Sequence, residues 1–311
     1  MPIADRNTLA HIALFIVNAI YGINYVIAKG LMPEAIGPNG FVLMRVLGAG
    51  ALFWLIYALR FERPAIADLV RLFLCGLFGV AVNQTMFFNG LMRTSPINSS
   101  TIMVATPILV LVLSAILINE RVTPTKVLGV VLGACGALAL IFFKPSDGGT
   151  GATLLGDLFI LINAISYGIY LVIVKPLMRK YNAITVMAWS FLFGLLIITP
   201  FSWKELSVVQ WHSLSNAVLA SFLFVVIMVT FVAYLLNTWA LGIVSASVVG
   251  TYIYIQPVLA ALGTWLFMRI GAERLGIPGQ YETPFGLPQL ICGAAIFLGV
   301  YLVSKREKEF R

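Results

Sequence analysis

The stretch NAIYGINYVIAKGLM at residues 18–32 returns in the same chain as NAISYGIYLVIVKPLM at residues 163–178, with one inserted residue. Both copies are apolar runs with a few amide, hydroxyl and aromatic side chains at helical spacing. A second match needs no gap: GLMRTSPINSSTIMVATPIL at residues 90–109 lies over ALGIVSASVVGTYIYIQPVL at residues 240–259. We therefore interpret the sequence as an internal duplication.

The composition is that of an integral membrane protein. Of the 311 residues, 60% are hydrophobic and only 10% are charged, whereas a soluble domain usually carries about 25% charged residues. Only helices and closed barrels span lipid, because every backbone polar group there must be bonded internally. The apolar runs are continuous rather than alternating, so the predicted spans are helices of roughly 20 residues.

Charged residues separate ten predicted transmembrane helices. The predicted spans cover residues 7–28, 35–59, 72–92, 94–119, 127–143, 158–174, 181–203, two helices within 206–268 that meet near 241–244, and 283–304.

The ten spans form two predicted repeats of five. The first repeat covers residues 1–143, a Gly-rich linker covers 144–151, and the second repeat covers 152–311. The short phrases NGFVLM from Asn39 and NAITVM from Asn182 also correspond. Because five is an odd number, the second repeat enters the membrane from the opposite side. The predicted fold class is an all-α integral membrane protein with ten transmembrane helices as two inverted five-helix repeats.

The charge distribution predicts the orientation of the chain. The net charge is +8, and thirteen of the twenty basic residues fall in the segments on the side of both termini, against six on the other side. The excess of Lys and Arg in cytoplasmic segments therefore places both termini in the cytoplasm. This distribution explains the charge without a nucleic-acid partner.

Several chemistries are not expected. The three cysteines, Cys75, Cys135 and Cys292, lie in separate spans without motif spacing, so neither a disulfide framework, a metal site nor a cofactor is predicted. The two histidines, His11 and His212, lie at span ends, and there is no catalytic constellation, so we do not expect an enzyme. All twelve acidic residues lie outside the spans or at their ends, which argues against proton-driven export of cations.

The candidate substrate-binding residues are polar and aromatic side chains at membrane depth. In the first span Asn18, Tyr21 and Tyr25 are spaced i, i+3, i+7 and share one face. The remaining candidates, from other spans, are Arg45, Asn83, Gln84, Asn163, Tyr167, Tyr170, Trp189, Tyr234, Asn237, Tyr254 and Gln256. Together they are suited to a cavity that stacks ring-bearing solutes and fixes them with amides and hydroxyls. For each residue alone, hydrogen bonding between helices is the alternative.

Two prolines occupy corresponding places in the second match, Pro107 and Pro257. Proline donates no N–H and crowds the carbonyl four residues earlier, so we expect each helix to kink or open there. The two positions are candidate hinges beside the cavity. Small residues at Gly129 and Gly133, and at Ala295 and Gly299, are typical of close helix packing.

Arg45 lies about seven residues inside the second predicted span, hence roughly 10 Å deep at ~1.5 Å per residue. One interpretation is that the side chain extends to lipid headgroups. The other is that it faces the cavity and attracts a substrate carboxylate, since a guanidinium offers a fixed fork of donors.

The order of these motifs resembles the drug/metabolite transporter superfamily, specifically its ten-helix EamA branch. The resemblance rests on the paired five-helix repeats, the Arg in LMRVLGAG, the run SSTIMVATPIL, the loop NERVTPTKVLGVVLGACG and, in the second repeat, GAERLG. An insertion, IPGQYETPFGLP at 277–288, has no counterpart in the first repeat. The resemblance implies an inner-membrane exporter or exchanger of amino acids or related metabolites.

The predicted function is secondary transport of small metabolites by alternating access, as export or exchange. The expected solutes are amino-acid-like or aromatic, and neutral or zwitterionic. The expected partners are this solute and the lipid bilayer; a homodimer is compatible but not required. The alternative is a membrane-embedded enzyme, or a receptor that binds a solute without translocating it.

Overall fold

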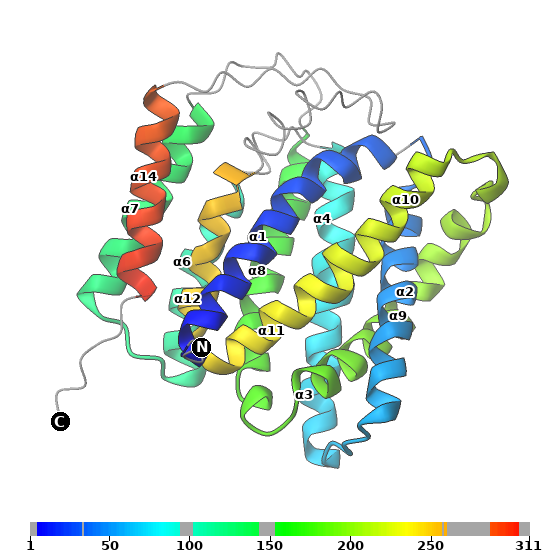
Figure 1. Ribbon diagram of the computed structural model, residues 1–311, viewed down its shortest axis with the longest axis horizontal. Coiled ribbons are helices and arrows are strands. Elements are labelled where there is room, and N and C mark those ends of the chain that lie inside the picture. Colours follow the sequence, from blue (N-terminus) through cyan, green and yellow to red (C-terminus); the bar gives the residue numbers. More distant parts are fainter. Residues whose placement is uncertain are drawn as a thin grey trace.

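The computed structural model describes residues 5–32, 34–93, 102–142, 153–256, 258–259 and 287–304. Throughout these ranges the regular structure is helical, without strands. Figure 1 shows the helices as a single bundle in which segments far apart in the sequence lie side by side. The predicted linker at 144–151 and most of the insertion at 277–288 fall outside the described residues.

Long apolar helices dominate the described part of the chain. Six are long and apolar enough to cross a membrane, namely Arg6–Asn24, Pro38–Leu59, Ile66–Arg93, Leu154–Arg179, Ala183–Ser207 and Asn216–Ile243. Four shorter apolar helices are Ala105–Ile118, Pro124–Gly136, Ala246–Ile255 and Ile291–Ser304. The predicted all-helical membrane architecture is therefore confirmed.

Within residues 1–143, the first predicted repeat, the helices are α1 (Arg6–Leu31), α2 (Pro38–Leu59), α3 (Ile66–Gly76), η1 (Leu77–Ala81), α4 (Val82–Arg93), α6 (Ala105–Ile118) and α7 (Pro124–Phe142). Within residues 152–311, the second predicted repeat, the helices are α8 (Leu154–Val174), η2 (Leu177–Arg179), α9 (Ala183–Ser207), η3 (Trp211–Ser213), α10 (Asn216–Phe224), η4 (Val225–Val232), α11 (Ala233–Ile243), α12 (Ala246–Thr251), η5 (Tyr252–Ile255) and α14 (Leu287–Ser304).

Two predicted helix boundaries can be compared directly with the structure. The long uncharged run divides where expected, because α11 ends at Ile243 and Ser245 caps α12 by accepting a hydrogen bond from Val248 N at 3.4 Å. The third span begins at Ile66 rather than at residue 72, so the predicted start was too late. The helix includes Asp68 because its carboxylate is paired with Lys180 Nζ at 3.0 Å.

Helices of the first predicted repeat pack closely against helices of the second. Helix α2 packs along α9, α4 along α8, α1 along α11, and α6 against α12, while α7 packs along α14. At the last contact the small residues predicted for close packing meet. A Cβ added at Gly299 would lie 2.6 Å from the carbonyl oxygen of Gly129, so only glycine permits this approach.

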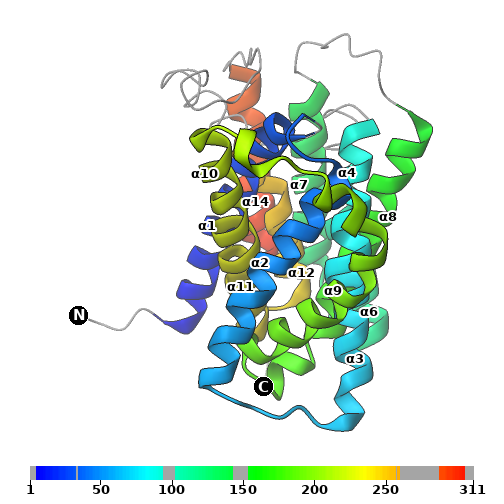
Figure 2. The same ribbon diagram turned by 90° about the vertical axis from the view of Figure 1, so that its right-hand side faces the viewer.

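Two helices contain π-helical segments at corresponding places. Segment η1 lies between α3 and α4, and η4 lies between α10 and α11, so that α10 and α11 form one long continuous helix (Figures 1 and 2). When the gap-free match is extended backwards, residues 77–81 fall on residues 227–231, inside η4. Short π segments inside α-helices frequently mark functional sites.

Helices α2 and α9 cap each other with carboxylates. Glu205, in the last turn of α9, accepts hydrogen bonds at the start of α2 from Asn39 N at 2.8 Å and Gly40 N at 3.0 Å. Glu62, just beyond α2, accepts hydrogen bonds from Asn182 N at 3.0 Å and Thr185 Oγ1 at 2.6 Å at the start of α9. We call these interactions the two carboxylate caps. Each places a negative charge where a helix N-terminus favours it.

Candidate functional site

A polar cavity of about 100 Å³ lies inside the bundle. Helices α1, α2, α4, α8 and α11 contribute to its wall, together with η4, η5 and the residues before α6. The cavity is lined by Tyr21, Asn24, Arg45, Asn83, Gln84, Phe87, Phe88, Met103, Asn163, Tyr167, Val229, Tyr234, Ile253 and Gln256.

Many of the candidates proposed from the sequence meet at this cavity. Those that line it are Tyr21, Arg45, Asn83, Gln84, Asn163, Tyr167, Tyr234 and Gln256. Three more lie directly behind it. Asn18 Oδ1 accepts from Gln256 Nε2 at 2.9 Å, Asn237 Nδ2 donates to Tyr167 OH at 3.2 Å, and the Tyr170 ring lies 6.1 Å from that of Tyr167.

Other candidates lie elsewhere. The Trp189 indole packs against Trp54, with ring centroids 5.6 Å apart, and its Nε1 donates to Tyr57 OH at 3.3 Å in the contact of α2 with α9. The Tyr254 ring lies against Gly133 of α7. The side chain of Tyr25 and all of Pro257 fall outside the described residues.

Pro107 is buried in the first turn of α6. The helical backbone is interrupted at Val104, next to Met103, whose carbonyl Pro107 leaves without its usual N–H donor. Met103 itself lines the cavity. The opening expected near this proline therefore lies beside the cavity, while the hinge role stays a prediction.

The sequence analysis missed some lining residues. Asn24 was detectable, because it follows Tyr21 by three positions and so shares its helix face. The other missed residues are apolar: Phe87, Phe88, Met103, Val229 and Ile253. An apolar side chain that faces a cavity gives the same sequence signal as one that packs in a core.

The π segment η1 supplies backbone carbonyls that bind side chains of the neighbouring helices. The carbonyl of Phe78 accepts a hydrogen bond from Ser166 Oγ at 2.6 Å, and that of Gly79 accepts one from Tyr234 OH at 3.3 Å. Nearby, Asn163 Nδ2 donates to the carbonyl of Asn83 at 2.8 Å. These side chains come from α8 and α11, so the irregular backbone fixes both helices around the cavity.

The π segment η4 holds the arginine. Thr230 Oγ1 donates to the carbonyl of Val225 at 2.8 Å and accepts from Arg45 Nε at 2.9 Å. The Arg45 guanidinium carbon also lies 4.7 Å from the ring centroid of Phe88 and 5.5 Å from that of Phe41, distances at which a ring face attracts a cation.

Arg45 is only 3% exposed, and its Nη1 has no hydrogen-bond partner. No acidic residue occurs among the described residues that line the cavity. Arg45 is therefore buried beside the cavity rather than extended to lipid headgroups, and its Nη1 is an unpaired donor. Such a buried charge without a counter-ion is costly unless a further group pairs with it.

Two unpaired acceptors belong to residues that line the cavity. Asn24 Oδ1 and Asn163 Oδ1 are buried without a hydrogen-bond partner, and both residues line the cavity. The cavity thus combines a cationic donor, two neutral acceptors and several aromatic rings. In the described part of the chain, no group of three or more His, Cys, Asp or Glu residues could hold a metal ion.

Comparison with known proteins assigns the family. The EamA-like transporter family matches at residues 8–142 and again at residues 154–277. The chain belongs to the EamA-like transporter family. This membership, together with the apolar helices, identifies a multi-pass membrane transporter and confirms the resemblance found in the sequence.

Relatives of this EamA-like transporter span most of its length. An uncharacterized transporter of Archaeoglobus fulgidus is 27% identical, covering 87% of this chain and 90% of the relative. The uncharacterized transporter YetK of Bacillus subtilis is 25% identical over 96% of this chain and 88% of its own. The protein WALLS ARE THIN 1 of Arabidopsis thaliana is 24% identical over 97% of this chain and 84% of its own.

A solved crystal structure has a similar fold. It matches with a TM-score of 0.69 at 18% sequence identity, covering 94% of this chain and 95% of the other. At this identity the likeness concerns the fold alone. The family and the names of the relatives are those of transporters rather than enzymes.

Proposed function

We propose that this EamA-like transporter moves a small metabolite across the inner membrane by alternating access, through export or exchange. The proposed solute has a carboxylate, an N–H donor and an apolar or ring-bearing body, as an amino acid has. The proposed fold has ten spans in two inverted repeats, residues 1–143 and 152–311, with both termini in the cytoplasm.

The inverted arrangement is supported by features that occur in pairs. The family matches twice along the chain. Segments η1 and η4 fall on each other when the matching stretches are aligned. The carboxylate caps also correspond, since Glu62 follows Asn39 by 23 positions and Glu205 follows Asn182 by 23 positions. The two caps lie at opposite ends of the α2 and α9 pair, and this supports a proposed axis across the helices, as in inverted-repeat transporters.

The proposed solute rests mainly on the unpaired Nη1 of Arg45. A planar guanidinium matches a carboxylate in charge and geometry, and burial strengthens the interaction. Asn24 Oδ1 and Asn163 Oδ1 are the acceptors that an N–H group of the same solute needs. The rings of Tyr21, Phe87 and Tyr167 then contact its apolar body.

The size of the cavity bears on how a solute binds. At about 100 Å³ it is smaller than typical ligand pockets of roughly 300–1,000 Å³. We therefore expect the wall to move when a solute of amino-acid size binds, as alternating access requires.

Transport by purified protein in liposomes tests the proposal. Counterflow of a panel of amino acids should exceed that of empty vesicles. The Arg45→Gln variant should then reduce transport of an accepted carboxylate about 10–100-fold, as expected for loss of a hydrogen bond to a charged group, and should change transport of its amide analogue much less.

The matched control is Arg71→Gln, which removes an exposed arginine of α3. It should leave both rates unchanged. An equal loss for the carboxylate and the amide with Arg45→Gln would contradict the proposed carboxylate contact, and absence of counterflow for the whole panel would exclude these solutes.

A further inference from the structure

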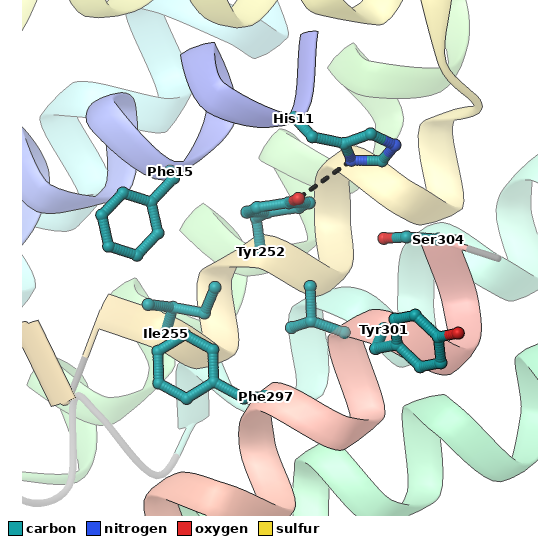
Figure 3. Close-up of a pocket in the computed structure, with 8 residues that line it drawn as sticks. His11, Phe15, Tyr252, Ile255, Phe297, Tyr301 and Ser304 are labelled. Atoms are coloured by element: carbon teal, nitrogen blue, oxygen red, sulfur yellow. Dashed lines mark hydrogen bonds between the residues drawn. The ribbon is translucent and has the colours of Figure 1, made fainter. Parts of the chain in front are cut away.

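A second hollow, larger than the cavity, lies on the outside of the bundle between α1, η5 and α14. Its volume is about 360 Å³, within the range of ligand pockets. Figure 3 shows His11 and Tyr252 near one end, where His11 Nδ1 and Tyr252 OH are hydrogen-bonded at 2.9 Å, together with Ser304. We call this hollow the lateral groove.

The lateral groove becomes apolar along its length. On α14, Phe297 lies seven residues before Ser304, hence about 10 Å along the helix. Phe297 is joined there by Phe15 of α1 and Ile255 of η5. Phe15 and Phe297 are exposed at the surface of the bundle, as is the neighbouring Leu298. The groove thus has a polar end and an apolar end, and exposed apolar side chains border the apolar end.

A wall of one helical turn separates the lateral groove from the polar cavity. The wall is η5, a 3₁₀ helix in which residues three apart lie on the same face. Tyr252 and Ile255 line the groove, whereas Ile253 and Gln256 line the cavity. The same short segment therefore borders both spaces.

Helix α1 also lines both the groove and the cavity, beside η5. Its residues Phe15, Asn18 and Tyr21 follow one another in steps of three positions, and each step turns by about 60° around the helix. Phe15 lines the groove and Tyr21 lines the cavity, while Asn18 between them is hydrogen-bonded to Gln256. One hydrogen bond thus joins α1 to the wall between the two spaces. A 3₁₀ stretch within a longer helix is a common hinge.

We propose that the lateral groove is a membrane-side binding site for the transported solute, which is an amphipathic molecule that partitions into the bilayer. Its apolar or aromatic body lies along Phe15 and Phe297, and its polar end lies at His11 and Tyr252. Separation of Gln256 from Asn18 then admits it to the cavity. The inference rests on the proposed transport through the cavity and narrows the solute to molecules with an apolar body.

Cysteine labelling tests the path without a transport substrate. The background replaces Cys75, Cys135 and Cys292 with alanine, and Val229→Cys places one thiol in the cavity. In liposomes, this thiol reacts either with N-(1-pyrenyl)maleimide, which partitions into the bilayer, or with a water-soluble, charged methanethiosulfonate. Val300→Trp narrows the groove, Phe297→Ala widens it, and Leu298→Trp on the exposed surface is the matched control.

Val300→Trp should slow the reaction of the cavity thiol with the pyrenyl maleimide at least fivefold, and Phe297→Ala should accelerate this reaction. Leu298→Trp should leave the rate unchanged, and none of the variants should change the rate with the charged reagent. If Val300→Trp does not fold, the opposite effect of Phe297→Ala carries the test. Rates that none of these variants alters would overturn the proposal and leave the groove as a lipid contact. Because this measurement needs no solute, its failure is distinguishable from failure of the Arg45 test.

Discussion

Arg45 combines a buried positive charge with an incomplete set of hydrogen bonds. Its charge is buried, one nitrogen is bonded to Thr230 and two phenylalanine rings lie within 6 Å, yet Nη1 is unpaired. Aromatic faces compensate only part of the lost hydration. A solute anion would complete the environment, so we expect Arg45 to contribute strongly to binding in the proposed function.

The amide of Asn24 gives a complementary prediction. Asn24→Leu removes the unpaired acceptor Oδ1 and keeps a side chain of similar size. We expect affinity for an amino-bearing solute to fall about two- to tenfold, the effect of one hydrogen bond. Competition binding against an analogue that lacks the amino group measures this. Equal losses for both compounds would show that Asn24 does not contact the amino group.

Gly299 predicts a packing effect independent of transport. A Cβ there would lie 2.6 Å from the carbonyl oxygen of Gly129, whereas a Cβ at Gly293 on the same helix would lie 4.0 Å from Val258 Cγ2, its nearest neighbour among the described residues. Gly299→Ala should destabilise the protein by about 1–3 kcal/mol through overpacking, and Gly293→Ala should not. Unfolding in detergent measures both variants, and similar stability for the two would contradict the close contact of α7 with α14.

Among the helices, α2 and α9 stand out because each supplies the cap of the other. The bonds join residues more than a hundred positions apart, so they act on the tertiary arrangement and not only on local helix stability. Charged acceptors at helix N-termini contribute through hydrogen bonds and through the helix dipole.

Removing either carboxylate cap should lower the stability of the protein. Glu205→Ala loses bonds to Asn39 N, Asn39 Nδ2 and Gly40 N, and Glu62→Ala loses bonds to Asn182 N and Thr185 Oγ1. Each should lower the free energy of unfolding by about 1–3 kcal/mol, with the larger effect at Glu205.

The control for both cap variants is Glu34→Ala, because Glu34 is exposed. Unfolding in mixed detergent compares the three variants under the same conditions. A stable Glu205→Ala variant would show that the contact of α2 with α9 does not depend on its cap.

For the whole molecule, the charge distribution predicts which ends of the helices face the cytoplasm. In a cysteine-free background, Ser213→Cys between α9 and α10 should react with an impermeant thiol reagent added to intact cells. Arg63→Cys, between α2 and α3, should react only after permeabilisation. The reverse pattern would overturn the proposed orientation of both termini.

Hydropathy and helical spacing were sufficient to predict the helical membrane fold and many of the cavity residues. They failed where the backbone departs from the α-helix. In η5 successive residues turn by about 120° rather than 100°, so Ile253 and Gln256 face the cavity while Tyr254 packs on Gly133. Trp189 lies away from the cavity for another reason: its indole nitrogen donates to Tyr57 OH within the α2 and α9 contact, which spacing alone does not reveal.

The carboxylate caps also set an order of events during synthesis. Asn39 leaves the ribosome 166 residues before Glu205, which corresponds to roughly 10–30 s at about 5–20 residues per second. Until Glu205 has been synthesised, the first N–H groups of α2 lack their carboxylate partner. Helix α9, by contrast, is made when Glu62 is already present. The contact of α2 with α9 therefore gains both carboxylate caps only after the end of α9 has been synthesised.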